Sequence, residues 1–197
     1  MKRREAVQTQ TGETRPAFAL TLGSPTGTVR LDLPSSDDEL DQAKRALRLD
    51  DLSGAAIEAV EIGYPWAHLL PTDSVTLEDA NVLAECVRGM AKEELRVFGA
   101  VLEVEEPHSF HEAGTIAMDI SDYELTTGNE REYAIAALGY AGAGDEILEM
   151  LDGFTDFEAL GRYEMEQDGV RETSFGCVRR LSAPWPQQEP EMGQAMY

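Results

Sequence analysis

Two histidines three positions apart form the part of this sequence that most resembles a metal site. His108 and His111 stand close to Glu105, Glu106 and Glu112. Imidazole nitrogens and carboxylate oxygens are common zinc ligands. This spacing matches no specific zinc motif, however, and a loop that leads into a helix explains it better. We therefore expect no metal site and no cofactor.

Carboxylates are the other groups that could do chemistry, because a pair of them can act as general acid and general base. The chain holds 38 Asp and Glu, so no single pair stands out. It contains no Gly-rich phosphate loop, no HExxH or GxSxG motif and no Cys/His zinc pattern. We expect a binding protein and not an enzyme. A small acidic hydrolase or metal enzyme is the alternative from another functional class.

The charge balance is the most unusual property of the sequence. The 38 acids face 16 Lys and Arg, which gives a net charge of -22 at pH 7. The acids concentrate in residues 31–170, and the flanks are relatively basic. A field of this size repels nucleic acid and anionic membranes and attracts basic partners. Salt adaptation with an unrelated function is a further alternative, because the only lysines are Lys2, Lys44 and Lys92.

Acids in the second half of the chain recur at helical spacing. Asp145, Glu149 and Asp152 would share one helix face, where like charges four residues apart are mildly destabilising. Residues 103–106 crowd a predicted helix C-terminus, where the helix dipole disfavours anions. Residues that are locally destabilising in this way concentrate at functional surfaces. The predicted partner-binding surface comprises Glu103, Glu105, Glu106, Asp119, Asp122, Glu124, Asp145, Glu146, Glu149, Asp152, Asp156, Glu158, Glu164 and Glu166.

Hydrophobic periodicity and capping patterns predict the elements that position these acids. Strands over residues 17–22 and 28–33 flank a five-residue hairpin loop, and a capping box at Ser36 opens a helix to about Arg48. A strand over 56–64 completes a β-β-α-β unit. The other predicted elements are helices from residue 77, over 92–104 and from 109 to 117, an extended segment at 119–125, helices near 130–138, 144–152 and 156–166, and a strand over 173–181.

These elements predict an α+β fold in which small α/β modules form an elongated chain. The predicted modules are a flexible N-terminus 1–15, an N-terminal module 16–71, a helical middle module 72–117, a C-terminal α/β module 118–181 and a disordered tail 182–197. Tyr123, Tyr163, Phe154 and Phe157 are expected to be core or interface aromatics. Cys86 and Cys177 form no CxxC pair, so two buried free thiols are expected.

Hydropathy predicts a cytoplasmic location. No apolar run approaches the roughly 18 to 20 residues that span a bilayer. The basic start of the chain is followed by polar residues and not by the apolar segment of a signal peptide. We expect no membrane association.

Several short motifs occur in an order that resembles the ArdA family of antirestriction proteins, in particular the branch from Gram-positive bacteria. Each motif is weak alone, and the resemblance depends on their order, their spacing and the acidity of the chain. The similarity covers roughly residues 17–178. The motifs are residues 31–40 (LDLPSSDDEL), 69–71 (LLP), 76–85 (TLEDANVLAE), 93–95 (EEL), 122–128 (DYELTTG) and 156–162 (DFEALGR).

The resemblance implies an inhibitor that imitates DNA. It implies a homodimer with a curved acidic surface shaped like bent duplex DNA. The implied partner is the DNA-binding cleft of a type I restriction-modification enzyme, formed by its methyltransferase and specificity subunits. It also implies origin in a phage or another mobile element. Another basic partner, such as a CRISPR effector or a histone-like protein, is the alternative within the same class.

Overall fold

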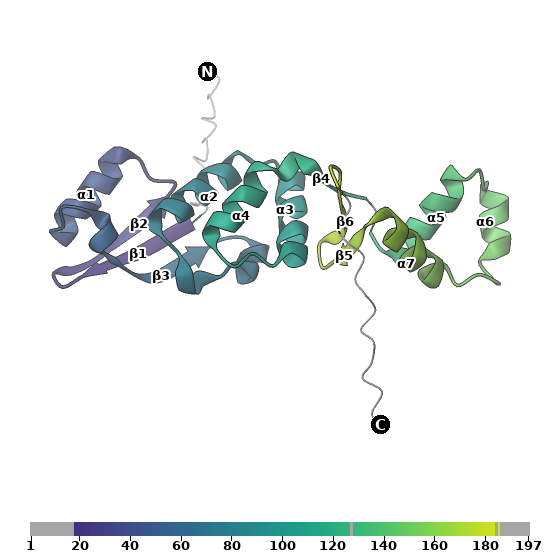
Figure 1. The fold of residues 1–197 in the computed structure, drawn as a ribbon, viewed down its shortest axis with the longest axis horizontal. Coiled ribbons are helices and arrows are strands. Elements are labelled where there is room, and N and C mark those ends of the chain that lie inside the picture. The colour runs from purple at the N-terminus through teal and green to yellow at the C-terminus, as the bar shows by residue number, and fades with distance from the viewer. Residues whose placement is uncertain (1–17, 127, 184, 186–197) are drawn as a thin grey trace, which may run out of the picture. The chain divides into compact units, whose positions relative to one another are not determined.

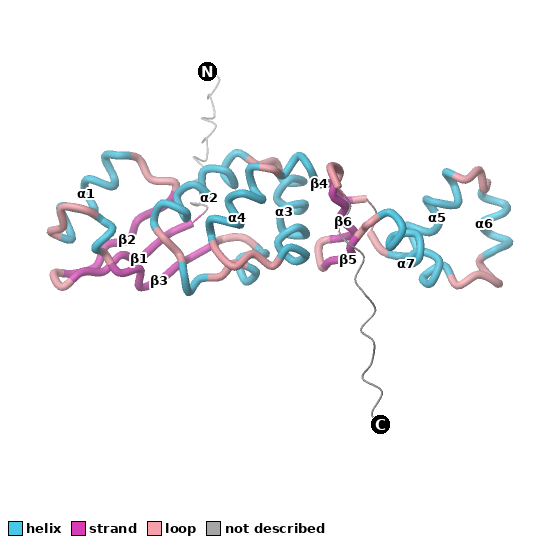
Figure 2. Tube along the Cα trace, viewed as in Figure 1, coloured by secondary structure: helices cyan, strands magenta, loops and turns pink. Residues whose placement is uncertain are grey.

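The computed structural model describes residues 18–126, 128–183 and 185. These residues form seven α-helices and two three-stranded antiparallel sheets, which confirms the predicted α+β class (Figures 1 and 2). The chain divides into two compact units, one ending at Tyr64 and the other beginning at Pro65. The predicted flexible N-terminus 1–15 and residues 186–197 of the predicted tail lie outside the described residues.

The first unit is a three-stranded sheet with one α-helix. Its sheet order is β2-β1-β3, so β1 lies in the centre and its side chains are buried on both faces. The α1 helix packs against β2. Phe18, Leu20 and Leu33 are among its most deeply buried side chains. The elements of this unit are β1 (Phe18–Ser24), β2 (Gly27–Leu33), α1 (Asp37–Leu47), the 3-10 turn η1 (Leu52–Gly54) and β3 (Ala56–Ile62).

The hairpin between β1 and β2 is tighter than predicted. Ser24 pairs with Gly27, so only Pro25 and Thr26 form the turn, and the predicted five-residue loop is wrong. Gly27 has a φ of 150°, a conformation that glycine adopts readily and other residues rarely do. This conformation allows β2 to begin pairing with β1 directly after the two-residue turn. The hydroxyls of Ser24 and Thr26 donate to the Leu47 carbonyl at 3.0 and 2.6 Å, so the turn also satisfies the end of α1.

The predicted capping box at the start of α1 is confirmed. The Glu39 amide donates to Ser36 Oγ at 3.4 Å, and the Ser36 amide donates to Glu39 Oε2 at 2.8 Å. The Ser36 amide and, at 2.7 Å, the Ser36 hydroxyl both donate to the Glu39 carboxylate, which lowers the pKa of Glu39. The helix ends at Leu47, and Arg48 adopts a left-handed conformation with a φ of 54°.

The two units meet between Tyr64 and Pro65, so residues 65–71 belong to the second unit, whereas the predicted boundary follows Pro71. Trp66 is buried and meets Phe98 edge-on, with 4.9 Å between ring centroids. Residues on both sides of the predicted division between 117 and 118 lie in this second unit. The α3 helix packs both against α4 and against the strands of the second sheet, so the helical and C-terminal modules form one compact unit.

Three helices form the first part of the second unit, together with short 3-10 turns. Thr76 and Ser109 are the N-caps of α2 and α4, as their sequence patterns predict. The Glu94 carboxylate caps α3 by accepting from the Ala91 amide at 2.6 Å. The elements are η2 (Pro65–Leu69), η3 (Thr72–Ser74), α2 (Leu77–Gly89), α3 (Lys92–Glu105) and α4 (Phe110–Met118).

The second sheet packs on α3 and has the order β4-β6-β5. The single strand predicted over 173–181 is instead a hairpin, in which Thr173 pairs with Gly176. Gly176 has a φ of 126°, and Thr173 Oγ1 donates to its carbonyl at 2.6 Å, which closes a two-residue turn. The elements are η4 (Ile120–Asp122), β4 (Tyr123–Leu125), β5 (Arg171–Thr173) and β6 (Gly176–Arg180).

The remaining helices confirm the predicted helical segments of the last third. They are α5 (Glu130–Tyr140), α6 (Asp145–Leu151) and α7 (Phe157–Asp168). The α5 and α7 helices pack tightly, and the absence of a side chain at Gly161 admits the Glu130 backbone. Between them in sequence, α6 has no buried residue.

Candidate functional site

The structure separates the predicted surface acids into two groups. The first group is engaged inside the fold and consists of Glu103, Glu105, Asp122, Glu124, Asp152 and Asp156. The second group, called the open acids below, accepts no hydrogen bond and forms no ion pair among the described residues. The open acids are Glu106, Asp119, Asp145, Glu146, Glu149, Glu158, Glu164 and Glu166.

The acids at the end of α3 have partners that the sequence did not reveal. The Glu103 carboxylate accepts from the Ser174 amide at 3.0 Å and from its hydroxyl at 2.6 Å. The Glu105 carboxylate accepts from Trp185 Nε1 at 2.8 Å. These contacts offset the unfavourable position of both anions at a helix C-terminus. Both carboxylates therefore have compensating contacts within the chain.

Two further predicted acids hold the edge of the second sheet together. Glu124 on β4 accepts from Arg179 Nε on β6 at 2.6 Å. Asp122 accepts from Arg180 Nε at 3.1 Å and from the Ser182 amide at 2.8 Å. Hydrogen bonds from Ser182 and Arg180 lower the pKa of Asp122. Both carboxylates therefore stabilise the local fold.

The predicted stripe of Asp145, Glu149 and Asp152 is incomplete. The α6 helix ends at Leu151, and Asp152 pairs with Arg131 on α5. Asp156 is the N-cap of α7 and accepts from the Ala159 amide at 2.9 Å. The sequence lacks Lys and Arg between Arg131 and Arg162, but tertiary packing still supplies a cation to one member of the stripe.

The open acids cluster on the last two helices of the second unit. Asp145, Glu146 and Glu149 are exposed on α6, and Glu158 and Glu166 are exposed on α7. Asp145, Glu146 and Glu158 lie in first helical turns, where the helix dipole favours anions, so these helices tolerate them. Anions at these positions are compatible with a rigid scaffold that keeps its carboxylates in solvent.

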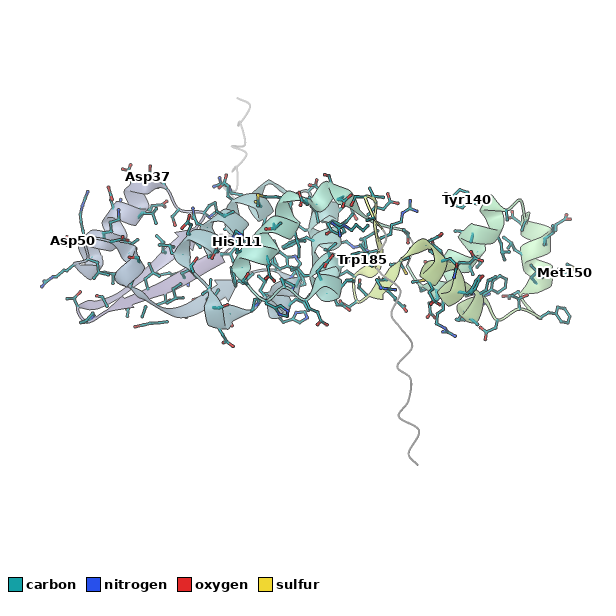
Figure 3. The ribbon with its side chains drawn as sticks, in the orientation of Figure 1. Asp37, Asp50, His111, Tyr140, Met150 and Trp185 are labelled. Atoms are coloured by element: carbon teal, nitrogen blue, oxygen red, sulfur yellow. The ribbon has the colours of Figure 1, made fainter. Side chains whose placement is uncertain are left out.

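Sequence reasoning missed exposed acids of the first unit. Asp37, Asp38, Asp50 and Glu58 are exposed, and none accepts a hydrogen bond or forms an ion pair within the described part of the chain. In Figure 3, Asp37 and Asp50 extend into solvent at the outer edge of this unit. Asp37 and Asp38 follow the N-cap residue of α1, so the sequence pattern around them indicates a helix start. That pattern does not indicate that their carboxylates stay exposed to solvent.

The histidine cluster does not assemble into a metal site. The His108 amide donates to the Glu112 carboxylate at 2.7 Å, which occupies that carboxylate locally. His111 Nδ1 lies 3.4 Å from Asp79 Oδ1 on α2. Within residues 18–126, 128–183 and 185, no group of three or more His, Cys, Asp or Glu side chains is arranged to hold a metal ion.

The two cysteines are free, but they differ in burial. Cys177 on β6 is fully buried, and Cys86 on α2 is half-buried, so the prediction of two buried thiols is correct only for Cys177. None of the described helices combines the length and the apolar character of a transmembrane span.

Comparison of the chain with protein-family models, curated proteins and solved structures found no match.

Proposed function

We propose that this protein is a non-catalytic inhibitor that imitates DNA and occupies the DNA-binding cleft of a type I restriction-modification enzyme. The observation that carries the proposal is the set of open acids on α6 and α7, whose carboxylates accept no hydrogen bond and form no ion pair among the described residues. Their charge is thus available to an external basic surface. The resemblance to ArdA proteins supplies the target, formed by methyltransferase and specificity subunits.

The charge density of α6 is comparable to that of a nucleic-acid strand. A helix rises about 1.5 Å per residue, so the seven residues of α6 span about 10 Å. Asp145, Glu146 and Glu149 place a charge about every 3.5 Å along it, and one strand of duplex DNA carries a phosphate about every 3.4 Å. A cleft that binds phosphates by charge would encounter a similar linear density here.

A folded scaffold gives such charges an advantage over a flexible acidic segment. The backbone of α6 and α7 is already ordered, so binding does not incur the full entropic cost of ordering a chain. The field of a protein with net charge -22 attracts a basic cleft over a distance set by ionic strength. Inhibition should therefore weaken steeply as salt rises.

The test compares two triple variants that lose the same charge. Asp145→Asn, Glu146→Gln and Glu149→Gln remove open acids of α6, and Asp37→Asn, Asp38→Asn and Asp50→Asn remove exposed acids of the first unit. Each variant competes with a duplex oligonucleotide for a purified type I enzyme across a salt series. We expect the α6 variant to lose more inhibition and to show the shallower salt dependence.

Equal losses in both variants would mean that total charge, and not the predicted surface, determines binding. If the unmodified protein does not compete with duplex DNA at low salt, the proposed function is wrong. Circular dichroism of both variants checks that the fold is retained.

A further inference from the structure

The α6 helix has little of the packing that holds its neighbours in place. None of its seven residues is buried, and Leu148 and Leu151 are half-buried. No other element of the described chain packs closely against it, whereas α5 and α7 pack tightly on each other. In Figure 1, α6 lies outside that pair of helices. Isolated helices shorter than about 12 residues are marginal in water, so α6 depends on a contact outside itself.

The ends of α6 add little stability. It begins at Gly144 without a side-chain cap, whereas α5 and α7 both begin at a residue whose side chain accepts from a backbone amide. The turn before α6 closes the end of α5, where the Ala143 amide donates to the Leu138 carbonyl at 2.9 Å. The turn after α6 is closed by the Thr155 amide, which donates to the Leu151 carbonyl at 2.9 Å. These bonds end the helices but do not fix α6 to the side of α5 or α7.

One side chain of α5 contacts both the residue that follows α6 and the core beneath it. Arg131 forms an ion pair with Asp152, directly after the last residue of α6. Its guanidinium also lies over the ring of Phe157 on α7, 5.0 Å from the ring centroid, and that ring is buried. A cation over an aromatic face is attracted by the charge distribution of the ring. Arg131 therefore joins the end of α6 to a rigid part of the fold.

The sequence offers no second cation for this contact. Residues 130–169 contain only two basic side chains, Arg131 and Arg162. Arg162 Nη1 lies 3.1 Å from Glu130 Oε2, so it joins α7 to α5. Residues 145–152 carry four acids and no base, and like charges one turn apart on a helix destabilise it. The Arg131 contact is therefore the main attachment of α6 to its neighbours.

We propose that Arg131 is the positioning residue of the α6 acids, because its contact with Asp152 keeps α6 folded against its neighbours, and residues 141–155 open as a local unit without it. The role of these acids in binding rests on the proposed function, whereas the attachment of α6 does not. A folded α6 presents its open acids at fixed spacing, but an open segment has to be ordered when a basic partner binds. The apparent affinity therefore falls with the fraction of molecules in which α6 is folded.

Replacing Arg131 separates position from charge, because the two act on binding with opposite signs. Arg131→Gln makes the protein more negative by one charge. If the overall field alone attracted the basic partner, this variant would bind at least as tightly as the unmodified protein. If Arg131 positions the α6 acids, the variant binds more weakly in spite of its greater negative charge. Arg162→Gln is the matched control, since it causes the same charge change and removes an exposed ion pair between α5 and α7.

The first measurement is amide hydrogen exchange of the full chain over residues 147–155, which needs no partner. Loss of an exposed ion pair and of a cation–π contact should accelerate exchange there roughly three- to thirtyfold in Arg131→Gln. Arg131→Lys keeps the charge and should restore much of the protection, and Arg162→Gln should leave exchange unchanged. The proposal is overturned by equal acceleration in the two glutamine variants or by no acceleration in Arg131→Gln. Exchange in the unmodified protein as fast as in an unstructured peptide overturns it as well.

The second measurement is competition of the same variants with a duplex oligonucleotide for a purified type I enzyme at one salt concentration. We expect Arg131→Gln to require at least about twofold more protein for half-maximal inhibition, which corresponds to an α6 that is open in half of the molecules. Arg162→Gln and Arg131→Lys should inhibit as well as the unmodified protein. Faster exchange with undiminished inhibition would overturn the positioning role. If the unmodified protein does not compete at all, the proposed function fails and the role in binding fails with it, while the exchange results still decide whether Arg131 holds α6.

Discussion

The indole Nε1 of Trp185 donates a hydrogen bond of 2.8 Å to the carboxylate of Glu105, a residue 80 positions earlier in the chain. The Trp185 ring also stacks on Tyr123 with 5.8 Å between centroids, and Arg180 lies over the same tyrosine ring. The predicted start of a disordered tail at residue 182 is therefore wrong for Ser182 and Trp185. Trp185 therefore links the end of α3, through Glu105, to the edge of the second sheet, through Tyr123.

Replacing Trp185 should reveal how much this attachment contributes. Trp185→Phe keeps an aromatic ring but removes the N–H donor, and should cost about 1 kcal/mol or less of unfolding free energy. Trp185→Ala also removes the stacking on Tyr123 and should cost roughly 0.5 to 1.5 kcal/mol more. Urea denaturation followed by circular dichroism measures both. An alanine variant as stable as the unmodified protein would show that the attachment contributes nothing.

Asp152 and Glu149 should respond differently to neutral substitution, although the sequence places them in one stripe. Glu149→Gln removes a like-charge neighbour of Asp145 and should stabilise α6 by a few tenths of a kcal/mol while weakening partner binding. Asp152→Asn loses the exposed ion pair with Arg131 and should cost at most about 1 kcal/mol. Its effect on inhibition should be smaller than that of Glu149→Gln. Thermal melting and the competition assay together test this order, and the reverse order would contradict the assignment of open acids.

The pKa of Asp122 should depend on Ser182. Hydrogen bonds from Ser182, and then from Arg180, lower this pKa below the usual value of about 3.9. A carboxyl whose pKa is lower in the folded state stabilises the fold above its unfolded pKa, and this contribution disappears as pH falls through the folded value. Ser182→Ala should raise the pKa of Asp122 toward its usual value. Carbon-13 NMR titration of the carboxyl group measures the change, and an unchanged value would contradict the assigned cause.

Two glycines in the last helices should respond in opposite ways to alanine. A Cβ at Gly161 would overlap the Glu130 carbonyl oxygen, so α5 and α7 would have to move apart. We expect Gly161→Ala to cost roughly 1 to 3 kcal/mol or more. Gly139 on α5 has open space around its Cβ position, so Gly139→Ala should stabilise by up to about 1 kcal/mol. Denaturant melts compare the two, and equal effects would disprove the close packing of α5 and α7.

Helix starts were predictable because their determinants are local. Ser36, Thr76 and Ser109 each accept a hydrogen bond from an amide three residues later, a relationship visible in the sequence itself. Most helices and the first hairpin were predicted for the same reason. The tight turns at Gly27 and Gly176 were missed, because alternation of hydrophobic residues does not specify where a ladder closes.

The sequence by itself determined the α+β class, the caps and the excess of negative charge, because each follows from composition or from residues within one turn of each other. Tertiary structure alone decided which carboxylates remain open. Glu103 meets Ser174, Glu105 meets Trp185 and Asp152 meets Arg131, all across long separations in the chain. A carboxylate is free or engaged according to the donors that packing brings within hydrogen-bond distance, and spacing along the chain carries no information about those donors.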